Sequence, residues 1–278
     1  MQRVGLLAGD GNLPLVFAHG ARTREVEVVA ISVTPNALAA ELAEIVDEHY
    51  QLSVAQLGAV IAKLKELDVE EVVMAGKVNK DLMFALDFDQ RAMTLLNRLQ
   101  EKNDDSILLA LVNELESEGI KVKQQTTYLE ELFPEIGQLN DVEPSEEDLF
   151  NMEFGFKMAK GIGALDIGQT VVVRDGAVIA VEAIEGTDKA ILRSGELAPG
   201  DMIVAKVSKP EQDFRFDIPT IGMQTMENLI KVGARGIVIE AGKTFILDET
   251  EVLAKANQAG ISVVAMGWQD EQGVISSR

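Results

Sequence analysis

The sequence predicts an α/β protein in which a Rossmann-like domain with a parallel sheet is joined by a linker to a mixed α/β domain. Its length of 278 residues suits one or two domains of about 150 residues. Residues 1–130 alternate short apolar runs with amphipathic stretches, as parallel sheets covered by helices do. Residues 131–144 lose this periodicity and hold prolines and acids, so we expect the linker there and a second domain over 145–278. In this architecture we expect the active site in the interdomain cleft.

The elements of the first domain follow from apolar periodicity. Strands are expected over residues 4–8, 26–33, 69–74 and 120–126. Apolar residues three and four positions apart predict helices over 54–67 and 104–118, the second closed by Gly119.

The second domain is predicted to open with a helix. Ser145 stands three residues before Asp148, which resembles a capping box, and the helix would end near Gly161 or Gly163. The aromatic and methionine residues over 150–158 also alternate as in a strand, but the length and the cap favour a helix. Downstream, the sequence predicts a hairpin over 170–181, strands over 202–207, 236–240, 243–247 and 261–266, and helices over 225–232 and 249–259.

Charge and composition exclude several classes of function. The 25 basic and 46 acidic residues give a net charge of −21. Such a chain is repelled by polyphosphate, so we expect no general nucleic-acid binding. The chain has no cysteine and two histidines, which excludes thiol nucleophiles and three-histidine metal sites. No apolar run approaches the roughly 20 residues of a membrane span, and no signal-peptide pattern precedes the first strand, so we expect a cytoplasmic protein.

Two turns of the first domain are candidate ligand contacts. The segment Gly9–Pro14 would join the first strand to a helix, where a backbone can approach a phosphate. Pro14 replaces the third glycine of the dinucleotide fingerprint, which argues against an NAD-dependent oxidoreductase. Gly76 and Lys77 follow a buried strand, at the edge where open α/β sheets bind ligands. A tight turn and a solvated lysine are the alternatives without a ligand.

The second domain has its chemistry-bearing residues between positions 182 and 225. Glu182, Glu185, Thr187 and Asp188 supply three carboxylates and a hydroxyl, the hard oxygen donors that Mg²⁺ prefers. In a strand over 213–217, Asp213, Arg215 and Asp217 would share one face, although a charged edge strand would look the same.

Basic residues are concentrated in this part of an otherwise acidic chain. The same part has no cysteine and no other obvious side-chain nucleophile. The basic residues are Arg193, Lys206, Lys209 and Arg215. Together with the carboxylates they favour metal-assisted hydrolysis of a phosphoanhydride.

The motifs together resemble the LpxI type of UDP-2,3-diacylglucosamine pyrophosphatase, an enzyme family of lipid A biosynthesis. They occur in the family's order and cover most of the chain. The motifs are GDGNLP at 9–14, AGKVNK at 75–80, NDDSIL at 103–108, LDIGQ at 165–169, VEAIEGTDKAILR at 181–193, KPEQDFRFDIPTIG at 209–222 and GARGIVIEAGKTFILD at 233–248.

This resemblance implies Mg²⁺-dependent hydrolysis of UDP-2,3-diacylglucosamine to UMP and 2,3-diacylglucosamine 1-phosphate (lipid X), with water attacking the β-phosphorus. It places the essential carboxylate on Asp217, with Asp188 as a second catalytic residue, and makes Asp217, Asp188 and Glu185 the metal ligands. The implied substrate-binding residues are Gly11, Asn12, Leu13, Pro14, Gly76, Lys77, Gln169, Gly186, Thr187, Lys209, Gln212, Arg215 and Thr220.

The chain departs from the family pattern at two positions, Asp10 and Lys80, where relatives often have glycine and arginine. The two acyl chains need apolar contacts, for which Leu82, Met83, Phe84, Leu86 and Phe88 are candidates, as are Phe150, Met152, Phe154 and Met158. Such a substrate implies peripheral contact with the cytosolic face of the inner membrane, and a homodimer is the default assembly. A nucleotide- or lipid-binding regulatory protein without turnover remains the alternative function.

Overall fold

The computed structural model describes residues 2–35, 38–78, 87–99, 104–269 and 273–275. The chain folds as two units, and each confirms the predicted α/β class. The first unit comprises residues 1–130 together with the short segment Phe214–Asp217, and the second comprises the remainder. Residues 131–144, where we expected the linker, belong to the second unit.

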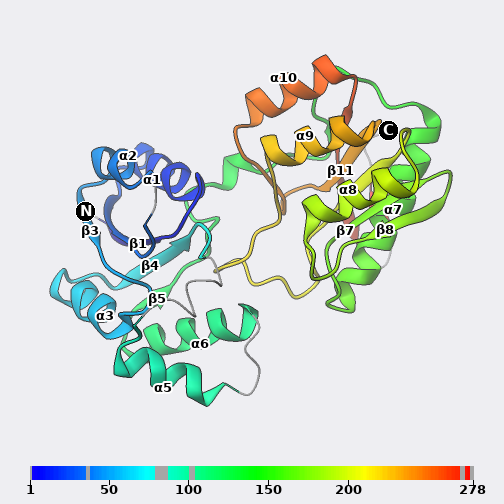
Figure 1. Ribbon diagram of the computed structural model, residues 1–278. Helices are drawn as coiled ribbons and strands as arrows, with labels where there is room; N and C mark the ends of the chain where they lie inside the picture. The colour runs from blue at the N-terminus through cyan, green and yellow to red at the C-terminus, as the bar shows by residue number, and fades with distance from the viewer. Residues whose placement is uncertain (1, 36–37, 79–86, 100–103, 270–272, 276–278) are drawn as a thin grey trace. The chain divides into compact units, whose positions relative to one another are not determined.

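The first unit is built on a parallel sheet of five strands in the order β3-β2-β1-β4-β5 (Figure 1). The central strand pairs with β2 residue for residue, from Arg3 opposite Glu27 to Ala8 opposite Ser32. The strands are β1 Arg3–Ala8, β2 Glu27–Ser32, β3 Glu48–Gln51, β4 Glu71–Ala75 and β5 Lys121–Val122. Strand β3 was not predicted, because its mostly polar residues form no apolar run.

Helices cover both faces of this sheet. The helices are α1 Leu13–Thr23, α2 Ala39–Ile45, α3 Leu57–Glu66, α5 Gln90–Arg98 and α6 Asp104–Ser117. The apolar rows of α3 and α6 pack on one face, with Val60, Leu64 and Leu115 among the buried residues. Phe88 packs partly buried against this core, whereas residues 82–86 of the expected apolar stripe lie outside the described residues.

The second unit has a mixed sheet in the order β14-β13-β11-β9-β7-β8, with β6 pairing on β13. Strands β9, β11 and β13 are parallel, whereas β7 and β8 form the predicted antiparallel hairpin. A second, two-stranded sheet joins β10 to β12. The strands are β6 Gly137–Gln138, β7 Thr170–Arg174, β8 Ala177–Val181, β9 Ile203–Lys206, β10 Thr220–Ile221, β11 Gly236–Glu240, β12 Phe245–Ile246, β13 Ser262–Gln269 and β14 Gly273–Ile275.

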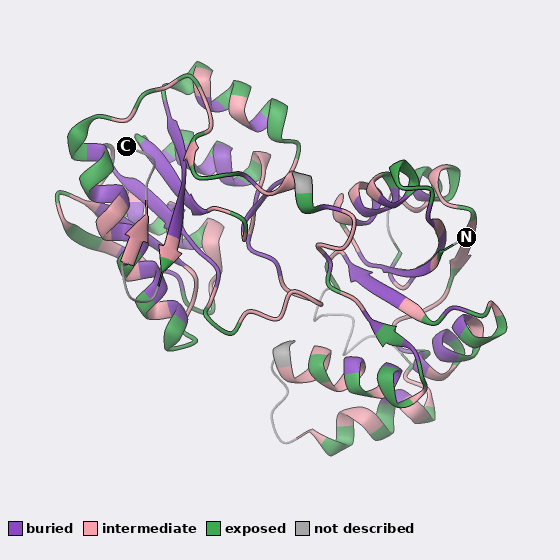
Figure 2. Cartoon of the chain, turned by 180° about the vertical axis from the view of Figure 1, so that it is seen from behind, coloured by how far each residue is buried: buried purple, intermediate pink, exposed green. Residues whose placement is uncertain are grey.

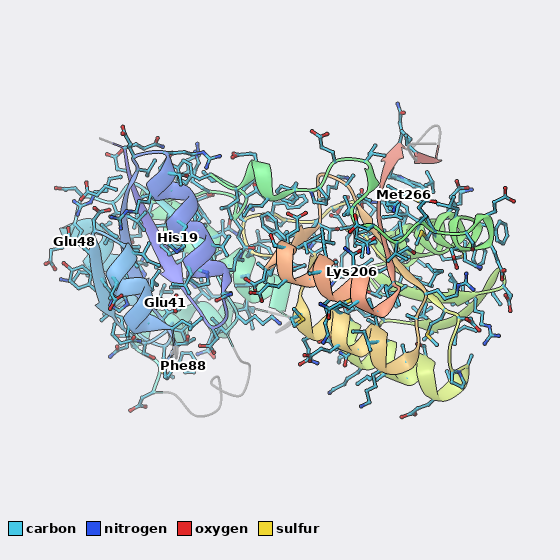
Figure 3. All side chains as sticks on the ribbon, turned by 90° about the horizontal axis from the view of Figure 1, so that it is seen from above. His19, Glu41, Glu48, Phe88, Lys206 and Met266 are labelled. Carbon is cyan, nitrogen blue, oxygen red and sulfur yellow. The ribbon has the colours of Figure 1, made fainter. Side chains whose placement is uncertain are left out.

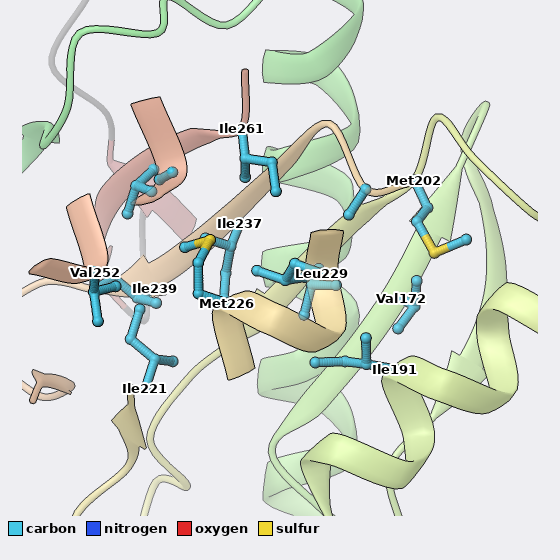
Figure 4. Packing of buried hydrophobic residues seen from close by; sticks show 14 of the residues in the cluster. Val172, Ile191, Met202, Ile221, Met226, Leu229, Ile237, Ile239, Val252 and Ile261 are labelled. Atoms are coloured by element: carbon cyan, nitrogen blue, oxygen red, sulfur yellow. The ribbon is translucent and has the colours of Figure 1, made fainter. Parts of the chain in front are cut away.

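Alternate side chains of these strands enter two cores, as the period of two requires. Val171 and Val173 face helix α7 (Glu146–Ala164), where Met152 and Phe156 are fully buried. Val172 faces the opposite side, where α8 (Thr187–Leu197), α9 (Met223–Val232) and α10 (Glu249–Ala259) cover the sheet. Figure 2 shows the buried strands in both units, and Figure 4 shows this second core, including Ile191, Met226 and Leu229.

The start of α7 confirms the predicted helix and its cap. The Ser145 hydroxyl accepts the Asp148 N–H at 3.1 Å, and Asp148 accepts the Ser145 N–H at 3.0 Å, which completes a capping box. Arg235 also binds the Asp148 carboxylate, at 2.9 Å. Burial of Asp148 opposes its ionisation, but the hydrogen bonds from Ser145 and Arg235 outweigh burial and hold the pKa below its ordinary value.

Replacing Asp148 by asparagine is expected to lower the free energy of unfolding by about 1 kcal/mol at neutral pH, as for other lost caps. Because the folded pKa is depressed, this stabilisation is present above the ordinary pKa of 3.8 and is lost as the pH falls through the folded value. Urea unfolding over a pH series should therefore find the two proteins different at pH 7 and converging in acid. Equal stability at pH 7 would contradict the prediction.

Candidate active site

In the first unit, the predicted turns lie side by side at the carboxyl edge of the sheet. The Gly9–Pro14 turn follows β1, and Gly76 and Lys77 follow β4, its neighbour. The chain places β2 and β3 on one side of β1 and then β4 and β5 on the other side. The boundary between β1 and β4 is therefore the topological switch point, where open α/β sheets bind ligands. The Asp10 N–H donates to the Lys77 carbonyl and the Lys77 N–H to the Asp10 carbonyl, both at 2.8 Å. The two turns therefore form one unit of backbone.

The remaining residues of this turn begin helix α1. Asn12 is its N-cap residue and Pro14 lies in its first turn, where a missing N–H costs nothing. Gly11 is exposed, whereas Asn12 and Leu13 are half-buried. The Thr34 hydroxyl, which follows β2, donates to the Asp10 carboxylate at 2.7 Å. Asp10, the departure from the family pattern, thus has a structural partner.

The two turns approach so closely that only glycine fits at Gly9. A Cβ there would lie 2.6 Å from the Lys77 carbonyl oxygen, which is backbone and has no freedom to rotate away. Gly76 is restricted in the same way, because its Cβ would lie 2.8 Å from the Asp10 carbonyl oxygen.

Gly9→Ala is therefore expected to separate the two turns and to raise the KM for a substrate bound there by about tenfold. This corresponds to a loss of about 1.4 kcal/mol of binding free energy. A matched control is Gly161→Ala, because a Cβ at Gly161 of α7 meets nothing within 4 Å. Steady-state kinetics of both variants checks this. An unchanged KM in Gly9→Ala would remove the turn from the site.

In the second unit, most of the predicted residues lie at one edge of the sheet. Strand β7 begins there, since Thr170 pairs with Lys206 at the end of the antiparallel strand β9. Strand β8 ends at the same edge and leads through Glu182 into the Gly186–Thr187 start of α8.

A chain of hydrogen bonds joins these strand ends. The Thr187 hydroxyl donates to Glu182 Oε1 at 3.1 Å and lies 3.2 Å from the Thr170 hydroxyl. The loop that precedes β7 packs closely on the residue that follows β8, because a Cβ at Gly168 would lie 2.2 Å from the Glu182 carbonyl oxygen. The Gln169 Oε1 atom is buried here and has no hydrogen-bond partner among the described residues, so it can accept a bond from a ligand.

Two helices begin together at this edge. Asp188, in the first turn of α8, accepts a bond of 3.4 Å from the Thr225 hydroxyl in the first turn of α9. Each helix has glycine as its N-cap residue, Gly186 for α8 and Gly222 for α9, so neither cap supplies a side chain to the first-turn N–H groups. Two such helix starts favour an anionic group.

Other predicted residues have local partners. Glu185 binds Arg193 at 2.5 Å and accepts the Ala183 N–H at 3.1 Å. The bond from Arg193 lowers the pKa of Glu185, so the carboxylate is ionised but already paired. Lys209 binds Asp166 at 2.5 Å, and the Gln212 side chain accepts the Lys209 N–H at 3.1 Å.

The segment that carries Asp217 differs from the prediction. Residues 214–216 form a turn and not a strand, so the expected shared face of Asp213, Arg215 and Asp217 is wrong. Phe214–Asp217 belongs to the first unit: Phe216 packs on its core, and Arg215 lies 3.4 Å from Glu116. Arg215, which was expected among the basic residues of the second domain, is therefore part of the first unit.

The oxygen donors of the second unit match the chemistry of Mg²⁺. Among the side chains that the structure describes, no group of three or more histidine or acidic residues could hold a metal ion by itself. Mg²⁺ is usually bound by one or two carboxylates together with substrate phosphates and water, which does not require such a cluster. Asp188 fits this role, whereas Glu185 would first have to leave Arg193.

A buried ion pair that was not predicted lies at the same edge of this sheet. Lys160 of α7 lies 3.0 Å from Glu240, the last residue of β11. The pattern held a signal for it, because Lys160 continues the core-facing row of Met152 and Phe156 at spacings of four. A lysine on that row requires a carboxylate partner.

Comparison with known proteins assigns the family. The model of the LpxI N-terminal domain matches residues 3–132, and that of the LpxI C-terminal domain matches residues 135–264. The chain belongs to the LpxI family. A curated relative from Caulobacter vibrioides, the UDP-2,3-diacylglucosamine pyrophosphatase LpxI, is 31% identical over an alignment of 286 positions that covers 97% of this chain and 99% of the relative.

Two solved structures illustrate a distant resemblance to this LpxI chain. The biotin carboxylase domain of Hydrogenobacter thermophilus 2-oxoglutarate carboxylase has a TM-score of 0.28 at 13% identity, covering 63% of this chain and 35% of that chain. An N5-carboxyaminoimidazole ribonucleotide synthetase has a TM-score of 0.29 at 11% identity, covering 100% and 69%. In the part of the LpxI chain that the structure describes, no helix has the length and apolarity to span a membrane.

Proposed function

We propose that this LpxI protein hydrolyses the diphosphate of UDP-2,3-diacylglucosamine to UMP and 2,3-diacylglucosamine 1-phosphate. The observation that carries the proposal is the relative of that activity, which is 31% identical along 97% of the chain. The convergence of the α8 and α9 helix starts, with Gln169, Thr187 and Asp188 beside them, supports a phosphate-binding role for the second unit.

In the proposed reaction, a water molecule attacks the β-phosphorus and the bond from that phosphorus to the bridging oxygen breaks. UMP leaves with the bridging oxygen, and the water oxygen stays on the sugar phosphate. The Asp217 carboxylate accepts the proton of the attacking water. Thr187, Gln169 and the α8 backbone orient the diphosphate, and Lys209, Gln212, Arg215 and Thr220 are further proposed contacts.

We propose Asp188 and Asp217 as the carboxylates that hold Mg²⁺. When bound, the ion neutralises charge on the diphosphate and so lowers the barrier to attack by water. The turns at Gly9–Pro14 and Gly76–Lys77 are proposed substrate contacts of the first unit, supported by their place at the switch point. A substrate with two acyl chains also supports peripheral contact with the cytosolic face of the inner membrane.

Incubation of the full chain with UDP-2,3-diacylglucosamine and Mg²⁺ should release UMP and lipid X in equal amounts. Heavy-oxygen water should label lipid X and not UMP, since attack on the β-phosphorus leaves the water oxygen on the sugar phosphate. Saturable binding without release of UMP would overturn the proposal in favour of a regulatory binding protein.

The metal ligands are separated by comparing two isosteric variants. Asp188→Asn is expected to raise the Mg²⁺ concentration for half-maximal turnover by about tenfold or more. Glu185→Gln should change it by less than about twofold, because Glu185 is already paired with the exposed Arg193. Equal effects in magnesium titrations of both variants would make Glu185 a ligand as well.

A further inference from the structure

The buried ion pair of α7 and β11 does more than fill the core. The side chains of Lys160 and Glu240 are 5% and 2% exposed, and the Lys160 Nζ also lies 6.0 Å from the centre of the Trp268 ring. Burying two charges is costly, and apolar side chains of similar volume often stabilise a core as well or better. The pair is therefore explained by what else it holds.

What it holds is the backbone of Ser208, a residue that is 1% exposed. Lys160 Nζ donates to the Ser208 carbonyl at 2.8 Å, and the Ser208 N–H donates to Glu240 Oε2 at 2.9 Å. Both backbone groups of this residue are thus bound by charged side chains, which form stronger hydrogen bonds than neutral partners do. Ser208 immediately precedes Lys209, so the pair fixes the start of segment 209–219.

A second buried lysine fixes the other end of that segment. Lys206, labelled in Figure 3, donates from Nζ to the Thr220 carbonyl at 2.7 Å. The carbonyl of Pro219 accepts the Phe245 N–H at 2.9 Å, which joins the same end to β12. Between these anchored ends lie Phe214–Asp217, which belong to the first unit.

We infer that Lys160, Glu240 and Lys206 are positioning residues that fix both ends of segment 209–219 and thereby hold Asp217 in its reactive position. The inference rests on the proposed function, because it assigns the reaction to Asp217. The three side chains act through the backbone of Ser208 and Thr220. A displacement of about 1 Å at a reacting group can reduce turnover by about a hundredfold, so ties of this kind affect rate.

The test uses the full chain with Lys160→Met and Glu240→Gln combined. This variant removes both charges at nearly constant volume, whereas one substitution alone leaves a buried charge with its main partner removed. We expect kcat to fall by about tenfold to a hundredfold with KM changed by less than about twofold. Lys206→Met should have the same kinetic signature, and both variants should speed amide hydrogen exchange over residues 208–220.

The control is Asn140→Ala, which removes bonds to Ile261 and Val263 at the opposite edge of the same sheet. It should lower stability without changing kcat or exchange over 208–220. Wild-type kcat and unchanged exchange in the double variant would overturn the inference, as would an equal loss of kcat in Asn140→Ala. Hydrogen exchange needs no substrate, so it tests the inference separately from the proposed function. If the wild-type chain releases no UMP, the proposed function fails. Exchange over 208–220 still decides whether Lys160, Glu240 and Lys206 fix the ends of segment 209–219.

Discussion

Asp217→Asn is expected to reduce release of UMP by about a thousandfold or more while the protein stays folded. Asparagine has nearly the size of aspartate but neither accepts a proton from water nor contributes negative charge to a metal site, and general-base catalysis alone contributes about a hundredfold to ten-thousandfold. Phe216, which anchors the segment in the first core, is unchanged in this variant. Initial rates with saturating substrate and Mg²⁺ measure the effect.

The matched control for this variant is Asp175→Asn. Asp175 is an exposed carboxylate in the turn of the β7–β8 hairpin, and its φ of 52° is one that asparagine adopts readily. The control should keep wild-type turnover. If Asp217→Asn also turns over at the wild-type rate, Asp217 has no catalytic role, and the carboxylate that activates water has to be sought elsewhere in the chain.

Much of the fold could be predicted because local patterns and the final structure agree. The capping box at Ser145, the hairpin turn at Asp175 and the helix ending at Gly260 are set by residues close together in the sequence. Their identities are dictated by backbone geometry, so the pattern alone predicts them. The position of Glu182 and Thr187 at the end of the sheet could also be predicted. Both residues follow the second strand of the predicted hairpin, so they lie where that strand ends.

The segment around Asp217 could not be predicted in the same way. Alternating charged and aromatic residues over 213–217 indicate a strand, yet Phe216 packs, partly buried, against a core whose residues all lie more than ninety positions earlier in the chain. A contact between residues so far apart in the chain produces no periodic pattern in the sequence. For Lys160 the periodic pattern of α7 does indicate a buried position, but it does not identify the partner Glu240, which lies 80 residues away.

Lys160→Met alone is expected to lower the free energy of unfolding of the second unit by about 3 to 5 kcal/mol, the range for breaking a buried ion pair. Glu240 would remain 2% exposed with only the half-exposed Lys243, at 3.0 Å, as a charged side-chain partner among the described residues. The single tryptophan, Trp268, lies in this unit beside Lys160, so its fluorescence in a urea titration reports the unfolding of this unit.

The double substitution separates the charge of the pair from its hydrogen bonds. Combining Lys160→Met with Glu240→Gln should recover most of the lost stability, because no unpaired buried charge is left and the glutamine oxygen still accepts the Ser208 N–H. The two substitutions should therefore be strongly non-additive in a double-mutant cycle. Additive losses would mean that Lys160 and Glu240 stabilise the unit through separate contacts. Recovered stability without recovered turnover would instead show that this LpxI chain keeps a costly ion pair for the position of segment 209–219, and not for the stability of its core.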